Sequence, residues 1–569
     1  MKFSDLALFL EKLEATSSRI EITKILANLF GKANANEIDK IVYLILGRLA
    51  PTYENVVFNI AERMMVVAIA DAYKKEKSDV QKKYKELGDL GLTAYTLAKT
   101  TGLHDLAIPS VPEVYDELRR IAKDEGEKSV ERKISGIAKL ISRLDPLSVK
   151  FVTRIPVGRL RLGFSDKTIL DALSWLEKGD KSAKRKLEKA YNMRPDIGYL
   201  AKLVKTKGLK DFSAGIKPDI KAPIAPMLAQ RLKSPEEMVA KMGLVSVEPK
   251  YDGLRILIHY KKPDYLRTYT RNLNFIDKSV FPELASLGKC IKADEVILDT
   301  EAVGMDPKRQ RLVDFQTTMQ RRRKHGVTAK SGDIPLQFQV FDVLLKDGQS
   351  LLGEKYVDRR AILERTIING PIIKIDEHTL TNDPREIKKL HKKYLKLGFE
   401  GIIVKKADSH YVSGRTGWRW VKMKEVETAA GKLADTIDCV VMGYTTGKGK
   451  RVGFGVGQFL AGIRAAGKIK TITKVGTGLT DEQFRELKSR LTKLEVKDKP
   501  LEYDVHKDLG PDFWVQPSLV VELAADEVTK SPKHTAGLAL RFPRLVRFRN
   551  DKSPAQATTL SEIKDLMVG

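Results

Sequence analysis

The stretch VSVEPKYDGLRIL at residues 245–257 decides how the middle of this chain is expected to fold. Apolar and polar residues alternate at its start and apolar residues return at its end, which is typical of a β-strand. Because side chains alternate across a strand, Glu248, Lys250 and Asp252 are expected to share one face. A lysine between two carboxylates is either an ion-pair cluster or a chemical site, and this stretch alone supports both equally.

A lysine amine acts as a nucleophile only when it is uncharged. With an ordinary pKa of about 10.4, it is the free base roughly once in 2,500 molecules at pH 7. The carboxylates of Glu248 and Asp252 would raise the pKa of Lys250 further. A catalytic Lys250 therefore requires burial, a metal ion or nearby arginine and lysine side chains that lower its pKa.

The composition limits the class of protein. The 569 residues are too many for one hydrophobic core, and 42% are hydrophobic, which suits a globular protein of several domains. We find no run of about 18 apolar residues and no secretory signal at the start, so no membrane partner and an intracellular location are expected. The two cysteines, Cys290 and Cys439, exclude a disulfide framework and a four-cysteine zinc site.

Three regions of different residue pattern predict three domains. Residues 1–220 carry apolar residues at spacings of three and four, which predicts an all-α region whose first helix Ser4 would cap. Residues 221–424 begin in a proline-dense segment and mix short β-rich runs with helices, so an α+β domain with a largely antiparallel sheet is expected. In residues 425–569, strands between glycine-rich turns suit a small β-barrel, interrupted by one helix with a capping box at Thr480.

The net charge of +28, from 102 basic and 74 acidic residues, favours a polyanionic partner such as nucleic acid. The alternative is a basic chain that is merely soluble or adapted to a hot or salty cell. Arg154, Arg159, Arg161 and Lys167 cluster around two glycines, which suits contacts with DNA phosphates and a solvated basic loop equally well.

The usual nucleotide-binding loops are missing from the sequence. Residues 462–468 have the spacing of a P-loop, but Ile469 stands where a magnesium-binding hydroxyl is required. No glycine fingerprint of a dinucleotide fold and no kinase loop set is present. Any nucleotide chemistry must therefore use other residues.

KYDGLR at residues 250–255 resembles the signature of the covalent nucleotidyltransferases, which comprise DNA ligases, RNA ligases and mRNA capping enzymes. The other elements of that signature follow in order: TRN at 270–272, LDTEAV at 298–303, VFDVL at 340–344, EGIIVK at 400–405, WRWVKMK at 418–424 and LRFPRLVRFRNDKSP at 540–554. With its helical start and PML at 226–228, the whole chain is similar to ATP-dependent DNA ligases of the archaeal and eukaryotic replicative type. An archaeal source fits the compact length best.

This resemblance implies a DNA-binding domain in residues 1–220, an adenylation domain in residues 221–424 and an OB-fold domain in residues 425–569. It also implies an enzyme that seals 5′-phosphate/3′-hydroxyl nicks in duplex DNA through a lysyl-AMP intermediate, in replication, repair and recombination. ATP would be the co-substrate and Mg²⁺ the metal, with Mn²⁺ as the alternative. We expect a monomer, nucleoid-associated in an archaeal cell, with a sliding clamp as a further partner.

The resemblance also implies a role for each residue that contacts the nucleoside. Lys250 would be the adenylated nucleophile, and Glu248 would bind the adenine amino group. Arg255 and Arg271 would hold the ribose and the nick phosphate. Phe341 would stack on adenine, although an isolated phenylalanine here would more simply be a core residue.

Carboxylates and lysines are implied around the phosphates. Glu301 would contact the ribose or a metal, and Glu400 would be the other metal ligand; as isolated residues both could be surface carboxylates. Lys422 and Lys424 would neutralise the α-phosphate, supported by core tryptophans beside them.

The last candidates are arginines, and one of them departs from the family pattern. Arg541 and Arg544, in the last region, would orient the β- and γ-phosphates during the first step. Family members commonly carry an arginine six residues before the first lysine of the fifth element, but here that position is Thr416 and the arginine is Arg415. Either the loop is shifted by one residue or Arg415 reaches the site differently, and Arg415 is included as a nucleotide-binding candidate.

Rival functions differ in what they require. An RNA ligase or capping enzyme does not call for the long helical region, and an NAD⁺-dependent ligase would usually bring a four-cysteine zinc finger. A DNA-binding scaffold with an inactive nucleotide site would not need Lys250, Glu301 and Lys422 together. ADP, GTP or NAD⁺ as additional donors stay open, and no clear clamp-binding segment is found.

Overall fold

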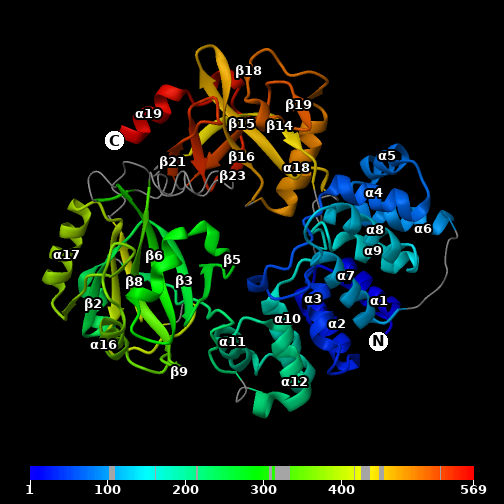
Figure 1. Cartoon of the computed structure of the whole chain (residues 1–569). Coiled ribbons are helices and arrows are strands. Elements are labelled where there is room, and N and C mark those ends of the chain that lie inside the picture. The colour runs from blue at the N-terminus through cyan, green and yellow to red at the C-terminus, as the bar shows by residue number, and fades with distance from the viewer. Residues whose placement is uncertain are drawn as a thin grey trace. The chain divides into compact units, whose positions relative to one another are not determined.

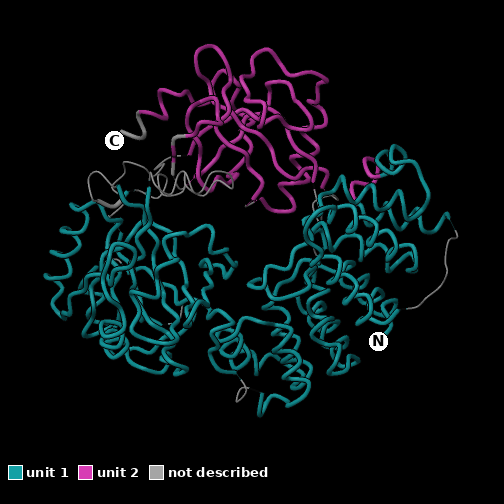
Figure 2. The backbone as a smooth tube through the Cα atoms, in the orientation of Figure 1, with its two compact units in different colours: residues 1–83, 90–425 teal, residues 84–89, 426–569 magenta. Residues whose placement is uncertain are grey.

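The computed structural model describes residues 1–101, 109–160, 162–212, 216–232, 234–306, 311–313, 334–414, 417–424, 436–447, 454–477, 479–525 and 527–568. It divides into two compact units (Figures 1 and 2). Unit 1 comprises Met1–Lys83 and Leu90–Glu425, and unit 2 comprises Tyr84–Asp89 and Val426–Gly569. The predicted boundary at residue 220 lies inside unit 1, so the division of that unit into two domains stays a prediction.

The N-terminal region is helical, as predicted. Its helices are α1 (Phe3–Ala15), α2 (Arg19–Lys32), α3 (Ile38–Ile45), α4 (Glu62–Tyr73), α5 (Lys77–Leu87), α6 (Leu90–Thr101), α7 (Val111–Ala122), α8 (Ser129–Ile141), α9 (Pro146–Arg154), α10 (Asp166–Lys178), α11 (Lys184–Met193) and α12 (Ile197–Asp211), with the 3₁₀ turn η1 (Thr52–Glu54). The predicted Ser4 cap is wrong, because α1 already begins at Phe3. The Phe3 amide donates to the Pro109 carbonyl at 2.9 Å, so a distant segment satisfies this helix start in place of a side chain.

A five-stranded sheet holds the KYDGLR segment. Its order is β1-β13-β12-β2-β11, and all its pairings are antiparallel except that of β1 with β13. The strands are β1 (Gln230–Arg231), β2 (Val245–Lys250), β11 (Thr379–Thr381), β12 (Gly401–Lys406) and β13 (Trp420–Lys424). Helices α13 (Pro235–Met242) and α17 (Pro384–Lys396) bury apolar residues against one face of this sheet.

A second sheet has the path β10-β8-β6-β3-β4-β5, with β7 paired to β6 and β9 paired to β8 (Figure 1). One of its faces is covered by an apolar cluster that includes Leu363 of helix α16 (Tyr356–Thr366). The strands are β3 (Leu254–Lys261), β4 (Tyr265–Thr270), β5 (Phe275–Ile276), β6 (Glu295–Asp306), β7 (Arg311–Leu312), β8 (Leu336–Lys346), β9 (Gln349–Ser350) and β10 (Ile373–Ile375), with 3₁₀ helices η3 (Lys278–Val280) and η4 (Pro282–Cys290).

The prediction that Asp252 shares a strand face with Lys250 is wrong. Strand β2 ends at Lys250, and the chain turns through Asp252 and Gly253 into β3. A Cβ at Gly253 would lie 2.5 Å from the Ala302 carbonyl oxygen of β6, so this turn requires glycine. The K-x-D-G pattern therefore marks a tight strand-to-strand turn that brings β2 and β6 together.

Unit 2 is rich in strands, as the sequence predicted, and its buried apolar residues form two clusters. Its main sheet follows β17-β19-β14-β15-β16-β18, with β20 joining β14 to β23, and β21 pairs with β22. The capping box predicted at Thr480 is confirmed at the start of α18. Its elements are β14 (Ile437–Thr445), β15 (Gln458–Ala465), β16 (Lys468–Val475), α18 (Asp481–Thr492), β17 (Glu495–Val496), β18 (Tyr503–Asp504), η6 (Lys507–Leu509), β19 (Phe513–Val515), β20 (Val520–Ala524), β21 (Glu527–Lys530), β22 (Leu538–Arg541), β23 (Arg544–Phe548), η7 (Pro554–Gln556) and α19 (Leu560–Val568).

Within the described ranges, no helix combines the length and the apolar composition needed to cross a membrane.

Candidate active site

The candidate site lies on the face of the five-stranded sheet opposite α17. Val245 and Val247 of β2 pack in the same apolar cluster as α17, whereas Glu248 and Lys250 point to the other face by strand alternation. Trp420 of β13, which lies on that other face, packs with residues of the eight-stranded sheet. The candidate residues of both sheets therefore meet between them.

Lys250 and Lys424 lie in one row across the sheet with a glycine between them. The strand register pairs Gly401 of β12 with Lys250 on one side and with Lys424 on the other. Gly401 has φ +143°, and a Cβ there would lie 2.2 Å from the Met423 carbonyl oxygen, so no larger residue fits. The glycine therefore lets β12 lie close against the backbone of β13.

Glu400 lies beside both amines. Its carboxylate forms ion pairs with both Lys250 and Lys424, and its amide donates to the Lys250 carbonyl at 3.0 Å. The side chain of Lys250 is 19% exposed, so solvent and a small ligand can reach it. One carboxylate thus holds two ammonium groups at the edge of an accessible site.

Several effects act on the pKa of Lys250, and burial is the largest. Burial lowers the pKa, the carboxylates of Glu301 and Asp252 raise it, and the Arg271 guanidinium lowers it, with a net shift downward. This is the direction that a nucleophilic amine requires. The ion pair with Glu400 favours the charged form, so losing that contact would favour the free base further.

Glu301 lies opposite Arg255 in the pairing of β6 with β3. Desolvation raises the pKa of its half-buried carboxyl to about 7, against the attraction of Lys250 and Arg255. A carboxyl that titrates near neutral pH beside a lysine of lowered pKa is typical of a functional site.

Arg255 is braced by protein partners that the sequence did not reveal. Its guanidinium donates to both Asp299 carboxylate oxygens, at 2.9 and 2.6 Å, and to the Met227 carbonyl at 2.7 Å. Burial would lower the pKa of Arg255, but Asp299 raises it above its ordinary value. The sequence did carry a signal for Asp299 as a site residue, because it stands two residues before Glu301 and therefore shares its strand face.

Phe341 of β8 is half-buried beside these groups. Its ring meets the Trp420 ring edge-on with centroids 5.9 Å apart, and the Arg255 guanidinium lies 5.4 Å from its centre. The predicted burial of Trp420 is confirmed, whereas Trp418 packs on the α17 side of the sheet. Phe341 keeps a partly open ring, which stacking on a base would require.

Glu248 is 1% exposed and already has protein partners. Its carboxylate accepts hydrogen bonds from Ser246 Oγ at 3.1 Å and from the Tyr356 hydroxyl, and it forms a 2.5 Å ion pair with Lys405. Sequence reasoning missed Lys405, although the signal that singled out Lys250 was present there too, a lysine within an apolar strand.

The remaining nucleotide candidates are exposed or half-buried. Lys422 is half-buried on β13 and aligns with Ile403 of β12. Arg271 is exposed just after β4. Arg541 and Arg544 of unit 2 are exposed on β22 and β23. Arg415 and Thr416 lie outside the described residues.

The predicted DNA-binding cluster is not one exposed loop. Arg154 is 6% exposed at the end of α9, where its guanidinium donates to Glu14 at 2.8 Å. Arg159 donates to Glu62 at 2.8 Å, and Lys167 is exposed on α10. Arg161 lies outside the described residues. Of the three that are described, Lys167 is therefore the most available to a DNA phosphate, and the DNA-binding role of all four stays a prediction.

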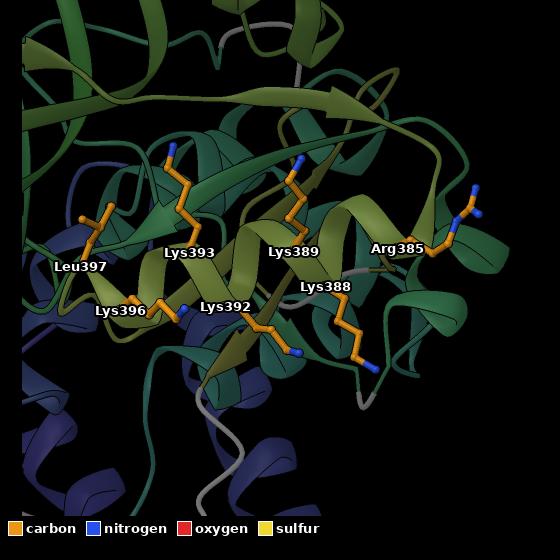
Figure 3. A pocket seen from close by; sticks show the side chains of 7 residues that line it. All are labelled: Arg385, Lys388, Lys389, Lys392, Lys393, Lys396 and Leu397. Atoms are coloured by element: carbon orange, nitrogen blue, oxygen red, sulfur yellow. The ribbon is translucent and has the colours of Figure 1, made fainter.

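A hollow of about 690 Å³ lies away from this site, along α17. Figure 3 shows basic side chains spreading outward from that one helix. Because α17 covers the opposite face of the sheet from Lys250, this hollow is not the nucleotide site. It is lined by Arg385, Lys388, Lys389, Lys392, Lys393, Lys396 and Leu397.

A metal ion would have to share its ligands with a substrate. Among the residues that the structure describes, no group of three or more His, Cys, Asp or Glu side chains could hold a metal. Glu301 and Glu400 nevertheless supply oxygen donors near Lys250. Mg²⁺ is commonly bound by one or two carboxylates together with substrate phosphates, so these residues fit such an ion.

Comparison with known proteins agrees with this geometry. Three family models match the chain: DNA ligase N terminus over residues 2–174, ATP dependent DNA ligase domain over 226–424, and ATP dependent DNA ligase C terminal region over 453–552. A probable DNA ligase of Dictyoglomus turgidum is 38% identical over 580 residues, covering 100% of this chain and 98% of the relative. A DNA ligase of Sulfolobus acidocaldarius is 34% identical over 591 residues, with coverage of 100% and 98%.

A solved structure named Pmar-Lig_Pre covers 96% of this chain and 99% of its own, with a TM-score of 0.53 and 18% identity, and so shares the fold. The family models and the full-length relatives together establish that the chain belongs to the ATP-dependent DNA ligase family.

Proposed function

We propose that this ATP-dependent DNA ligase uses Lys250 as its nucleophile. The Lys250 amine loses a proton and bonds to the α-phosphorus of ATP, while the bond to pyrophosphate breaks. An oxygen of the DNA 5′-phosphate then bonds to the AMP phosphorus, and the phosphorus–nitrogen bond breaks. Finally the 3′-hydroxyl oxygen bonds to the 5′-phosphorus, and AMP leaves. The observation that carries this proposal is the accessible Lys250, whose pKa is lowered by burial, in one row with Lys424.

Lys422 and Lys424 would assist Lys250 by binding the phosphates of ATP. Lys424, which shares Glu400 with Lys250, can transfer its ion pair to the α-phosphate when ATP arrives. Lys422 lies two residues earlier on the same strand face and would add a second positive charge. Withdrawal of Glu400 from Lys250 would then favour the free amine.

Glu301 and Glu400 would hold Mg²⁺, or Mn²⁺ in its place. A bound divalent ion supplies positive charge that offsets the phosphate charges of ATP. The carboxyl of Glu301, whose pKa is raised to about 7, would gain from any cation because its ionised form is poorly solvated.

The nucleoside would lie between the two sheets. Phe341 supplies a half-open ring for adenine, and Glu248 supplies an acceptor for its amino group. Arg255 and Arg271 would meet the ribose and the nick phosphate, with Arg255 held in place by Asp299. We include Arg415 only as a candidate.

The other regions would serve the DNA and the triphosphate. Residues 1–220 would bind duplex DNA, and residues 425–569 would form an OB-fold whose Arg541 and Arg544 orient pyrophosphate before it leaves. We expect a monomer that works inside the cell in replication, repair and recombination, with a sliding clamp as a further partner. The basic excess of the chain supports contacts with DNA phosphates.

Nick sealing on an end-labelled duplex, with a panel of nucleotide donors, tests this function. We expect joining with ATP and a divalent cation, and none with a duplex that lacks the 5′-phosphate. A protein that binds the nicked duplex but joins no ends with any donor would instead be a scaffold with an inactive nucleotide site. Efficient joining of nicked RNA in preference to DNA would favour an RNA ligase.

A further inference from the structure

We infer that Lys405 is a positioning residue that holds in place both side chains proposed to contact adenine, and that it thereby sets the preference for ATP over GTP. The inference rests on the proposed function. Lys405 is 1% exposed, and its Nζ forms the 2.5 Å ion pair with Glu248 and donates to the Phe341 carbonyl at 2.9 Å. One ammonium group therefore joins the proposed hydrogen-bonding residue to the strand that carries the proposed stacking residue.

Three aromatic rings surround this ammonium. Lys405 Nζ lies 4.9 Å from the centres of the Phe341 and Tyr356 rings and 4.6 Å from that of the Trp420 ring. A buried charge is expensive unless it is paired, and attraction to ring faces supplies part of what water would have given. The charge of Lys405 is thus fixed in position from several directions, and Glu248 is fixed with it.

A second carboxyl completes the arrangement behind Glu248. Asp376 is buried and hydrogen-bonds to Glu248, and the Arg360 guanidinium donates to it. Burial, followed by the charge of Glu248, raises the pKa of Asp376 well above its ordinary range. Asp376 therefore keeps its proton and presents a hydroxyl, not a second negative charge, to the Glu248 carboxylate.

An acceptor-only carboxylate discriminates between purines. Adenine presents an amino group at its six-position, which can donate to Glu248, whereas guanine presents a carbonyl oxygen there, which a carboxylate repels. Without the ion pair to Lys405, the Glu248 carboxylate would no longer be held in the orientation that accepts from the adenine amino group and repels the guanine carbonyl. Loss of Lys405 should therefore weaken ATP binding and strengthen GTP binding relative to it.

Self-adenylation of the full-length chain, measured against ATP and GTP concentration, tests this role. We expect Lys405→Met to raise the KM for ATP at least tenfold, to change kcat less, and to reduce the preference for ATP over GTP at least tenfold. Lys405→Arg, which keeps the charge, should recover part of that preference. The matched control is Lys406→Met, the next residue on β12, whose 35% exposed side chain lies 3.6 Å from Asp408 and should leave both constants unchanged.

An unchanged preference for ATP in Lys405→Met, whatever happens to its overall rate, would overturn the inference. If that variant does not fold, Lys405→Gln, which loses the charge but can still donate to the Phe341 carbonyl, decides instead: a tenfold fall in preference supports the inference, and an intact preference overturns it. Where Lys405→Met does fold, a double variant that also carries Glu248→Gln should lose no more of the preference for ATP over GTP than either single variant. Failure of the wild-type chain to self-adenylate would count against the proposed function, because it would occur before any comparison of donors.

Discussion

Lys250 combines two features that oppose each other. The carboxylates of Glu301, Asp252 and Glu400 would hold its amine charged, yet burial shifts its pKa downward. The balance allows a lysine that rests as an ion pair with Glu400 and becomes reactive when that carboxylate is drawn to another cation. The reactivity proposed for Lys250 is therefore explained by the charged groups around its amine, and not by the K-x-D-G motif alone.

The pH dependence of self-adenylation should reveal two groups. The reaction needs Lys250 uncharged and, in our proposal, Glu301 ionised, with a pKa of about 7. The logarithm of the rate should therefore rise with a slope near two below about pH 7 and near one above it. In Glu301→Gln, which is slower throughout, the break near pH 7 should vanish. A break that survives in this variant would show that another group titrates there.

Glu301 should also cost stability at neutral pH. The pKa of its carboxyl rises on folding from 4.5 to about 7, so the folded state favours the protonated form. That preference is fully present below pH 4.5 and is lost as the pH rises through 7. Glu301→Gln should therefore be more stable than wild type at pH 8, by up to about 3 kcal/mol, and equally stable at pH 4. Thermal unfolding at the two pH values checks this; an equal gain at both would contradict it.

The resemblance to the covalent nucleotidyltransferases supplied most of the site residues, and strand alternation agrees with it by placing Lys422 and Lys424 on one face. What sequence could not supply were partners from distant segments. Asp299 braces Arg255, and Lys405 pairs with Glu248, only because separate strands are brought together. Arg154 looked available for DNA because its partner, Glu14, lies far away in the chain.

The turn between β2 and β3 is the element on which the site depends most. It was predicted as continuous strand because a period of two does not reveal where pairing ends. The start of the first helix was misjudged for a related reason, since the partner that replaces the predicted Ser4 cap is the Pro109 carbonyl, far away in the chain. By contrast, the Thr480 box involves only neighbours in sequence and was predicted correctly.

Gly253→Ala should disable the enzyme through the backbone. Its Cβ would lie 2.5 Å from the Ala302 carbonyl oxygen, so β2 and β6 must move apart and Lys250 must shift relative to Glu301. We expect loss of stability of about 1–3 kcal/mol and a large loss of self-adenylation. The matched control is Gly353→Ala, because nothing lies within 4 Å of a Cβ there. Self-adenylation of Gly253→Ala at the wild-type level would show that the turn tolerates a side chain.

For the molecule as a whole, the charge of +28 implies that binding to DNA weakens steeply with salt. Individual basic residues should contribute unequally, because some are already neutralised within the protein. Lys167 is exposed, whereas Arg154 is buried and paired with Glu14.

Lys167→Gln and Arg154→Gln should therefore affect different properties, DNA binding in the first case and thermal stability in the second. If Lys167 contacts a phosphate, its loss should reduce the slope of log affinity against log salt by about 0.9 and leave thermal stability unchanged. Arg154→Gln should lower thermal stability, because Glu14 loses a buried partner, with little change in the slope. Binding of nicked duplex over a range of salt concentrations measures the first effect. The reverse pattern would move the DNA contact from Lys167 to Arg154.

The most direct measurement is the site of covalent labelling by α-labelled ATP in the absence of DNA. Wild type should retain label after denaturation, release it in acid as a phosphoramidate does, and yield one modified peptide containing Lys250. Lys250→Ala should take up none, while Lys261→Ala, at a 53% exposed lysine on neighbouring β3, should label normally. Label that persists in Lys250→Ala, or maps to another residue in wild type, would refute the proposed nucleophile.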